Sequence, residues 1–257
     1  MTRTALITGS TSGIGLVIAR EFARAGYQLI FNGLEPDGER IAAETVAPFG
    51  ARHRYFSTDL RNPAEIRKMV EDGLDTFGTI EVLINNAGIQ YVSPVEDFPE
   101  DKWNDLLSVH LGAAFHLSKA LFPSMKKRQY GRIINISSAH GLIASPYKSA
   151  YVAAKHGLTG LTKTLAMEGG AFGITANAIC PGYVLTPLVE KQIPEQMQVH
   201  GMNRAEVIEK IFLKEHAVKE FITPEAIAAT ALFLADSTAA PYISGAAIAV
   251  DAGWTAH

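Results

Sequence analysis

Short runs of apolar residues alternate with longer amphipathic segments along almost the whole chain. Apolar runs of this length predict buried strands. They occupy residues 5–7, 29–31, 82–84, 132–137, 174–179 and 247–250, with a further strand-like segment at 53–57. Helices are predicted where apolar positions recur every three or four residues, at 16–25, 36–47, 63–77, 101–128, 150–168 and 224–235. Strands that are apolar throughout and alternate with helices are typical of a parallel sheet covered on both faces. We therefore predict an α/β fold with a doubly wound parallel sheet.

No linker, internal repeat or break in composition divides the chain, so a single domain over residues 1–257 is expected. One segment, residues 187–221, is polar and predicts helix only in pieces. Thr223 and Pro224 then begin the last helix, with Thr at the N-cap and Pro at the first helical position.

Composition and charge narrow the possible functions. The chain is 47% hydrophobic and 19% charged, which allows a sizeable core. A net charge of −3 gives no electrostatic reason to expect nucleic acid or an anionic membrane as a partner. The single cysteine, Cys180, rules out an internal disulfide and fits a reducing compartment. The apolar stretch at the N-terminus is too short for a signal peptide or a membrane span. We expect a soluble cytoplasmic protein, and no metal.

Three glycines, Gly9, Gly13 and Gly15, lie between the first strand and the first helix. Glycines at such a turn let the backbone approach a phosphate, while the helix N-terminus offers free N–H groups. Their spacing is GxxxGxG, and a purely structural strand–helix turn is the alternative. Asp59, after the third strand, could accept a hydrogen bond from an adenine amino group. The segment 86–88, after the fourth strand, would line the same crevice.

A second constellation suggests proton transfer. Ser138 ends an apolar run that predicts a buried strand, and Tyr151 and Lys155 are four residues apart in a predicted helix. That spacing places the phenol and the ammonium on one helical face. By itself the pair is weak evidence, because such a spacing occurs by chance in many helices.

Taken together, these segments resemble the short-chain dehydrogenase/reductase family. Residues 8–15, Asn85-Asn86-Ala87-Gly88, Ser138, Tyr151-x-x-x-Lys155 and Pro181-Gly182 occur in its order and spacing over essentially the whole chain. The resemblance implies a Rossmann-type fold with seven strands, a nicotinamide cofactor and, usually, a homotetramer. It also implies a set of cofactor-binding residues, which in this chain are Gly9, Thr11, Ser12, Gly13, Ile14, Gly15, Leu34, Asp59, Leu60, Asn86, Ala87, Gly88, Tyr151, Lys155, Pro181, Gly182 and Val184.

The chemistry that the resemblance implies involves three residues. Tyr151 takes the alcohol proton, Ser138 hydrogen-bonds the substrate oxygen, and Lys155 holds the nicotinamide ribose. A free tyrosine has a pKa of about 10 and is a poor base at neutral pH. Lys155 and an oxidised nicotinamide ring would both favour the phenolate.

The residues after the second strand indicate which cofactor binds. A 2′-phosphate calls for Arg or Lys there, but this chain has Asn32-Gly33-Leu34-Glu35. Glu35 would repel a phosphate, and Gly33 stands where an aspartate often grips the ribose. We predict NAD, held by backbone groups and by contact with Leu34.

His110 stands where the family usually has an asparagine that supports a water relay beside the lysine. A neutral imidazole can still donate one hydrogen bond and accept another, so the relay can survive and His110 joins the predicted catalytic residues. A tolerated structural replacement is the alternative. A titrating His110 would also make activity more dependent on pH.

The substrate-facing residues resemble more narrowly the subfamily of D-3-hydroxybutyrate dehydrogenases. There, a Gln, a His, a Lys and a Gln on a mobile lid grip the carboxylate; the matching residues are Gln90, His140, Lys148 and Gln192. The lid corresponds to residues 187–221. The resemblance thus implies NAD-dependent interconversion of D-3-hydroxybutyrate and acetoacetate, with Ser138 and Tyr151 also touching the substrate.

The chain departs from that subfamily at two points. Tyr183 replaces a Trp after Pro-Gly, which suggests tolerance of slightly longer 3-hydroxy acids. The Gln-Pro usual near Glu215-His216-Ala217 is absent. Other readings stay open: a different 3-hydroxy or 3-oxo acid, an acyl thioester, a polyol, or a non-catalytic NAD-binding relative.

Overall fold

A computed structural model describes residues 2–256, and every side chain in that range except those of Leu188 and Glu195. Its centre is one seven-stranded sheet in the order β3-β2-β1-β4-β5-β6-β7, with every adjacent pair parallel. The strands are β1 (Thr4–Ile7), β2 (Gln28–Asn32), β3 (His53–Phe56), β4 (Val82–Asn85), β5 (Gly131–Ile136), β6 (Ile174–Pro181) and β7 (Ala247–Val250). The predicted doubly wound parallel sheet is confirmed.

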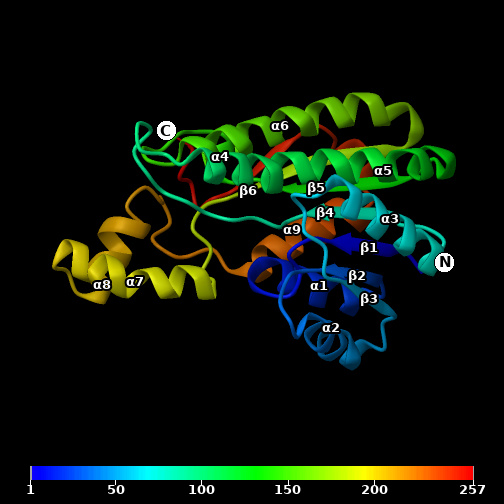
Figure 1. Ribbon diagram of the computed structural model, residues 1–257, viewed down its shortest axis with the longest axis horizontal. Coiled ribbons are helices and arrows are strands. Elements are labelled where there is room, and N and C mark those ends of the chain that lie inside the picture. Colours follow the sequence, from blue (N-terminus) through cyan, green and yellow to red (C-terminus); the bar gives the residue numbers. More distant parts are fainter. Residues whose placement is uncertain (1, 257) are drawn as a thin grey trace.

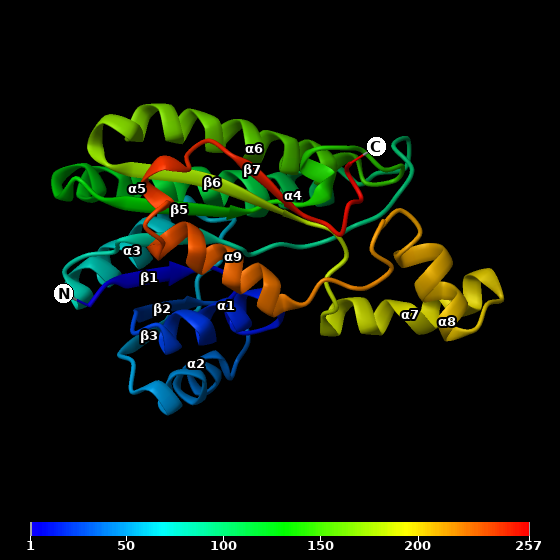
Figure 2. The same cartoon turned by 180° about the vertical axis from the view of Figure 1, so that it is seen from behind.

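Helices cover both faces of this sheet (Figures 1 and 2). They are α1 (Gly13–Arg24), α2 (Gly38–Val46), α3 (Pro63–Phe77), α4 (Glu100–Leu107), α5 (Ala113–Arg128), α6 (Ser149–Gly169), α7 (Pro187–His200), α8 (Arg204–Val207) and α9 (Pro224–Asp236). One core layer packs α1, α2 and α9 against the sheet. The other packs α3, α5 and α6 against the opposite face. Burial on both faces explains why the strands are apolar throughout.

The strand order reverses between β1 and β4, because the chain builds β2 and β3 on one side of β1 and β4 to β7 on the other. The loops that follow these two strands diverge and leave a crevice at the carboxyl edge of the sheet. The glycine loop follows β1, and Asn86-Ala87-Gly88 follows β4. The two segments meet there, since the Thr8 hydroxyl accepts hydrogen bonds from the N–H groups of Asn86 (2.9 Å) and Ala87 (3.0 Å).

The structure differs in one respect from the single long helix predicted over residues 101–128. This helix is divided into α4 and α5 by a wider π-helical turn at Ser108–Gly112, which contains His110. Such turns shift the side chains that follow and are frequent at functional sites. Helix α1 also begins earlier than predicted, at Gly13 instead of Leu16, so the last two glycines of the loop belong to its first turn.

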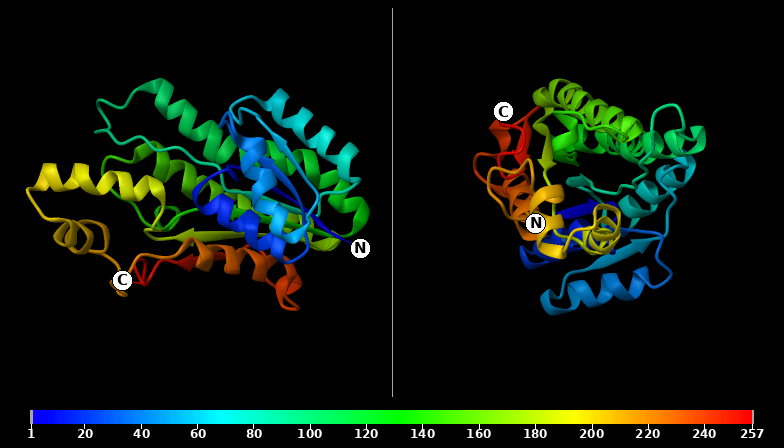
Figure 3. Two further views of the ribbon diagram at one scale, coloured as in Figure 1. Left: turned by 90° about the horizontal axis from the view of Figure 1, so that it is seen from below. Right: turned by 90° about the vertical axis from the view of Figure 1, so that its left-hand side faces the viewer.

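The segment predicted to be helical only in pieces projects beyond the carboxyl edge of the sheet as α7, α8 and a π-helical turn at Ile208–Phe212 (Figure 3). Its small separate core consists of Ile193, Val207, Phe212 and Leu213. Within the described range, no helix has both the length and the apolar composition that a bilayer crossing requires. The same residues contain no cluster of His, Cys, Asp or Glu suited to a metal ion.

Candidate active site

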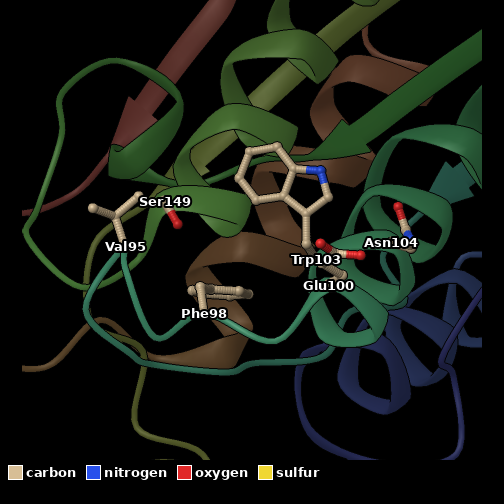
Figure 4. A pocket seen from close by; sticks show the side chains of 6 residues that line it. All are labelled: Val95, Phe98, Glu100, Trp103, Asn104 and Ser149. Carbon is tan, nitrogen blue, oxygen red and sulfur yellow. The ribbon is translucent and has the colours of Figure 1, made fainter.

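A cavity of about 1180 Å³ opens at the carboxyl edge of the sheet, between the strand ends and α7. Every residue predicted for catalysis, cofactor or substrate lines it, except Thr11 and Gly15. A smaller cavity of about 330 Å³ is lined by Val95, Phe98, Glu100, Trp103, Asn104 and Ser149 (Figure 4), none of which the sequence singled out. The candidate active site is therefore the larger cavity.

The glycine loop has a backbone conformation suited to binding a phosphate. Gly9 and Gly13 have positive φ angles of 59° and 52°, which only glycine adopts without strain. Gly15 packs against the carbonyl of Gly9 so closely that a Cβ there would overlap it, which explains why Gly15 supports the cavity without lining it. Ser12 precedes α1 and makes no side-chain cap, so the first N–H groups of α1 remain available to an anion.

Glu35 lies just after β2, two residues beyond Gly33, the position where an aspartate often grips the ribose. Its carboxylate accepts hydrogen bonds from the Thr11 hydroxyl and from the Leu34 N–H (3.0 Å). A Cβ at Gly33 would overlap both Thr11 and Glu35. The missing side chain at Gly33 therefore leaves room for a carboxylate that arrives from two residues further along the chain. Thr11 contributes by holding Glu35.

The Asp59 carboxylate, predicted to accept from an adenine amino group, already has a partner within the protein. Arg61, which sequence reasoning missed, contacts Asp59 (2.7 Å) and Asp105 (3.2 Å). The Arg61 guanidinium holds the pKa of Asp59 below its usual value. Arg61 is thus a cation at the cofactor end of the cavity, but two carboxylates already pair with it.

Ser138, Tyr151 and Lys155 come together as predicted from their spacing. Ser138 follows β5, while Tyr151 and Lys155 lie in the first two turns of α6. Lys155 is 4% exposed, and its Nζ donates to the carbonyl of Ile136 (2.7 Å). Its Nζ lies 5.5 Å from the centre of the Tyr151 ring. Burial lowers the pKa of Lys155 to about 7.

The expected effect of Lys155 on the phenol does not arise from the protein alone. Burial raises the pKa of Tyr151, and the hydrogen bond with Ser138 only partly opposes this. Lys155 directs its ammonium to a backbone carbonyl and loses charge near neutral pH. Desolvation is therefore the largest influence on the pKa of both groups.

His110 packs edge-on against Tyr151, with ring centres 5.1 Å apart. Its Nε2 lies 2.7 Å from the Ile89 carbonyl, and its buried Nδ1 has no partner among the described residues. A Cβ at Gly88 would meet the imidazole at about 2.5 Å, so glycine is needed for this contact. Burial, helped by the charge of Lys155, lowers the pKa of His110 to about 3. Because burial disfavours the protonated imidazole, the structure gives no support to a pH dependence of activity that arises from His110.

The four residues predicted to grip a carboxylate all face the same cavity. Lys148 precedes α6, and its Nζ lies 5.8 Å from the centre of the Tyr183 ring. Burial lowers the pKa of Lys148, and no carboxylate contributes. Gln90 reaches the cavity from the loop after β4, and Gln192 from α7.

His140 uses both ring nitrogens within the protein. Nε2 lies 2.6 Å from the Ser145 hydroxyl, and Nδ1 lies 3.4 Å from the Ser138 hydroxyl. Burial, with Lys148 nearby, lowers the pKa of His140 to about 4. A neutral imidazole has one N–H, so a carboxylate would compete with Ser145 for Nε2.

Sequence reasoning missed part of the cavity wall. Trp254, in the turn after β7, stacks on Tyr183 with ring centres 5.3 Å apart and planes 9° apart. Phe212 meets Tyr183 edge-on at 5.3 Å. Gln196 lines the cavity four residues after Gln192 on α7, a spacing that could have revealed it. The tail 251–254 resembles the subfamily, but only tertiary packing brings the Trp254 ring to the site.

Known proteins resemble this chain over its whole length. A family model described as short chain dehydrogenase matches residues 3–197. A protein of Rhizobium meliloti (strain 1021) named D-beta-hydroxybutyrate dehydrogenase is 50% identical, and the match covers 100% of both chains. A protein of the same name from Cupriavidus necator is 45% identical, over 99% of this chain and 98% of its own.

A solved structure supports the same grouping. It is the crystal structure of a single-residue variant of actinorhodin polyketide ketoreductase with NADPH. The two chains are 28% identical, with a TM-score of 0.93, and the match covers 100% of this chain and 98% of the other.

Proposed function

Since the chain belongs to the short-chain dehydrogenase family and is thus an oxidoreductase with an NAD(P)-binding Rossmann fold, we propose that it interconverts D-3-hydroxybutyrate and acetoacetate with NAD. The main observation in favour of an anionic substrate is the position of Lys148. Its half-buried ammonium faces the cavity and has no carboxylate partner among the described side chains. A charge in that position is stabilised by an anion. Two relatives named D-beta-hydroxybutyrate dehydrogenase support a 3-hydroxy acid.

The cavity fits a nicotinamide dinucleotide. The close approach at Gly9 and Gly15 and the uncapped start of α1 suit a pyrophosphate. Glu35 supports NAD over NADP, because its carboxylate would accept from a ribose hydroxyl and repel a 2′-phosphate. Arg61 does not offset this, since Asp59 and Asp105 both pair with it. A bound NAD would supply the acceptor for the hydride that leaves C3 of the hydroxy acid.

Tyr151 removes the proton from the 3-hydroxyl group as the general base, and returns it in the reverse direction. Ser138 hydrogen-bonds the same oxygen. Burial raises the pKa of Tyr151; the positive nicotinamide ring would favour the phenolate and oppose this effect, while Lys155 would hold the nicotinamide ribose. His110 keeps its neutral imidazole beside Tyr151 and presents Nδ1 as a site for a relay.

The carboxylate binds in the same cavity as Ser138, where Gln90, Lys148 and Gln192 form part of the lining. Lys148 supplies the charge, and Gln90 and Gln192 supply N–H donors from a loop and from α7. His140 joins this clamp only by releasing Ser145. Residues 187–221 act as a lid, since α7 brings Gln192 to the clamp and its small core is separate from the main one.

The deciding experiment follows NADH formation by the purified protein with D-3-hydroxybutyrate, with its L enantiomer and with a polyol, together with NADH oxidation by an acetoacetyl thioester. We expect strong activity with the D acid alone. A faster reaction with the polyol or the thioester would refute the proposed substrate. No turnover of any of them would favour a non-catalytic NAD-binding protein.

Cofactor choice has its own test. The wild type should prefer NAD over NADP. Glu35→Arg should shift the ratio of kcat/KM towards NADP by about tenfold or more, because it replaces a repelling charge with an attracting one. Glu39→Arg, on the exposed side of α2, is the matched control. Equal shifts in both variants would show that Glu35 does not read the 2′ position.

A homotetramer is the proposed assembly. Large apolar side chains are exposed on α5 (Phe115, 45%), α6 (Met167, 85%) and α9 (Phe233, 46%), and assembly would cover such residues. Sedimentation velocity tests this, and a monomer at micromolar concentration would contradict it.

A further inference from the structure

His216 is a buried histidine outside the cavity, 1% exposed, at the root of the projecting segment. The N–H of Tyr183 donates to its Nε2 (3.2 Å), and its Nδ1 lies 3.1 Å from the Glu220 carbonyl oxygen. A backbone N–H can only donate and a carbonyl can only accept. Both contacts therefore require the same neutral tautomer, with the proton on Nδ1.

These contacts join the two ends of the lid. Tyr183 lies where the chain leaves the sheet for α7, and Glu220 where it returns. The same two segments are linked by the Ile222 N–H to the Tyr183 carbonyl (3.0 Å) and by the Leu185 N–H to the Ile222 carbonyl (3.1 Å). Without His216, the N–H of Tyr183 and the carbonyl of Glu220 would lose these side-chain partners, both of them in partly buried contacts.

The neighbourhood is built to admit the imidazole. A Cβ at Gly182 would lie 2.8 Å from Nε2 of His216, so a larger residue there would push the ring away. The N–H groups of Ala217 and Val218 donate to the carbonyl of Ala252 at 2.8 and 3.0 Å. This docks the segment against the turn that carries Trp254, whose ring centre lies 5.7 Å from that of His216.

His216 therefore sits behind the wall formed by Tyr183 and Trp254. Tyr183 and Trp254 line the cavity, and the ammonium of Lys148 lies over the Tyr183 ring. A shift of the Tyr183 backbone would move the stacked rings and the space beside Lys148 together.

We propose that His216 is a positioning residue for substrate binding: by holding the Tyr183 N–H and the Glu220 carbonyl, it fixes the aromatic wall that confines the short chain of the hydroxy acid. This role rests on the proposed function, since it assumes that the acid binds between Lys148 and Tyr183. It makes no contact with the reacting atoms, so its effect falls on KM more than on kcat.

The test compares His216→Leu with His216→Gln. Leucine fills the space without hydrogen bonds, whereas the glutamine amide can accept from Tyr183 and donate to Glu220. We expect His216→Leu to raise KM for D-3-hydroxybutyrate about fivefold or more, with kcat and the Kd of NADH changed less than about twofold. His216→Gln should restore most of the KM. His200→Leu, an exposed position of α7, is the matched control.

Three outcomes would overturn the proposal. The first is an unchanged KM in His216→Leu. The second is a His216→Gln variant as impaired as His216→Leu. The third is a parallel loss of NADH binding, which would indicate a general structural role.

A measurement on the wild type keeps the proposal testable if His216→Leu does not fold. Nitrogen NMR of histidine-labelled protein should show His216 neutral and protonated on Nδ1, and the Tyr183 amide should exchange slowly with solvent. A proton on Nε2, or rapid exchange, would refute the assignment. Neither readout needs substrate, so each separates a failure of this proposal from a failure of the proposed function.

Discussion

The two sides of the active-site cavity are built differently. Ser138, Tyr151 and Lys155 lie at the end of β5 and in the first turns of α6, which packs against the sheet. The other part of the wall comes from the loop before α6, the turn after β7 and the projecting α7, where Lys148, Trp254 and Gln192 lie. The first side has a geometry that the core dictates. The second depends on segments with few core contacts, which can change without disturbing the fold.

This difference separates chemistry from selectivity. Changes on the sheet side should reduce kcat with every substrate. Changes on the other side should alter which acid binds and how tightly. The following substitutions test that division, beginning with the largest expected effect.

Replacing Tyr151 with phenylalanine removes the proton acceptor and keeps the ring that packs against His110. We expect kcat to fall by about 10³-fold or more, while the Kd of NADH changes little. Steady-state kinetics and fluorescence titration of NADH measure the two quantities. Residual turnover above about one-tenth of the wild type would place the proton transfer elsewhere.

Lys148→Met removes the charge while keeping the length of the side chain. Because charge-assisted hydrogen bonds contribute more than neutral ones, we expect kcat/KM to fall about 10- to 100-fold, mostly through KM. Lys191→Met, an exposed lysine of α7, is the matched control. If kcat fell and KM stayed constant, Lys148 would belong to the chemical side of the cavity, and the division above would fail.

Tyr183→Trp changes the volume of the wall that stacks on Trp254. The wild type should oxidise 3-hydroxyvalerate at a rate comparable to 3-hydroxybutyrate. In the variant, the ratio of kcat/KM for the longer acid should fall about fivefold, in the range expected for one methylene. A steep preference for the shorter acid in the wild type would count against the role of Tyr183.

His110→Asn has the smallest expected effect on activity and a clear effect on stability. The folded His110 has a pKa of about 3, against 6.5 for the unfolded residue. As pH falls below 6.5, the unfolded chain binds a proton that the folded site refuses, so stability falls until about pH 3. Between neutral pH and about pH 5 the variant should lose about 1–2 kcal/mol less than the wild type.

Denaturant unfolding at the two pH values measures this difference, with His140 remaining in both proteins as an internal reference. The shape of the kcat profile should be the same in both over about pH 6 to 9, because a neutral His110 has no charge to lose there. A new inflection in the wild type alone would show that His110 titrates during turnover.

Most of the fold could be predicted because its signals are local. Continuous apolar strands and the cap at Thr223 and Pro224 depend on neighbouring residues, and the structure contains them. The π-helical turn at Ser108–Gly112 could not be predicted, since its sequence differs little from that of an ordinary helix. The bounds of α1 were missed because glycines rarely begin a predicted helix, yet Gly13 does so here.

Residue order alone was enough to predict the sheet, the glycine loop and the grouping of Ser138 with Tyr151 and Lys155, because each follows from spacing within one element or at one strand end. Only the tertiary structure shows that the Glu35 carboxylate occupies the space beside Gly33 and that Trp254 stacks on Tyr183. It also shows that His216 contacts the backbone at both ends of the lid. Burial in the folded chain also lowers the pKa values of His110 and His140. These features escape the sequence because close contact and desolvation depend on segments far apart in the chain, which no local pattern records.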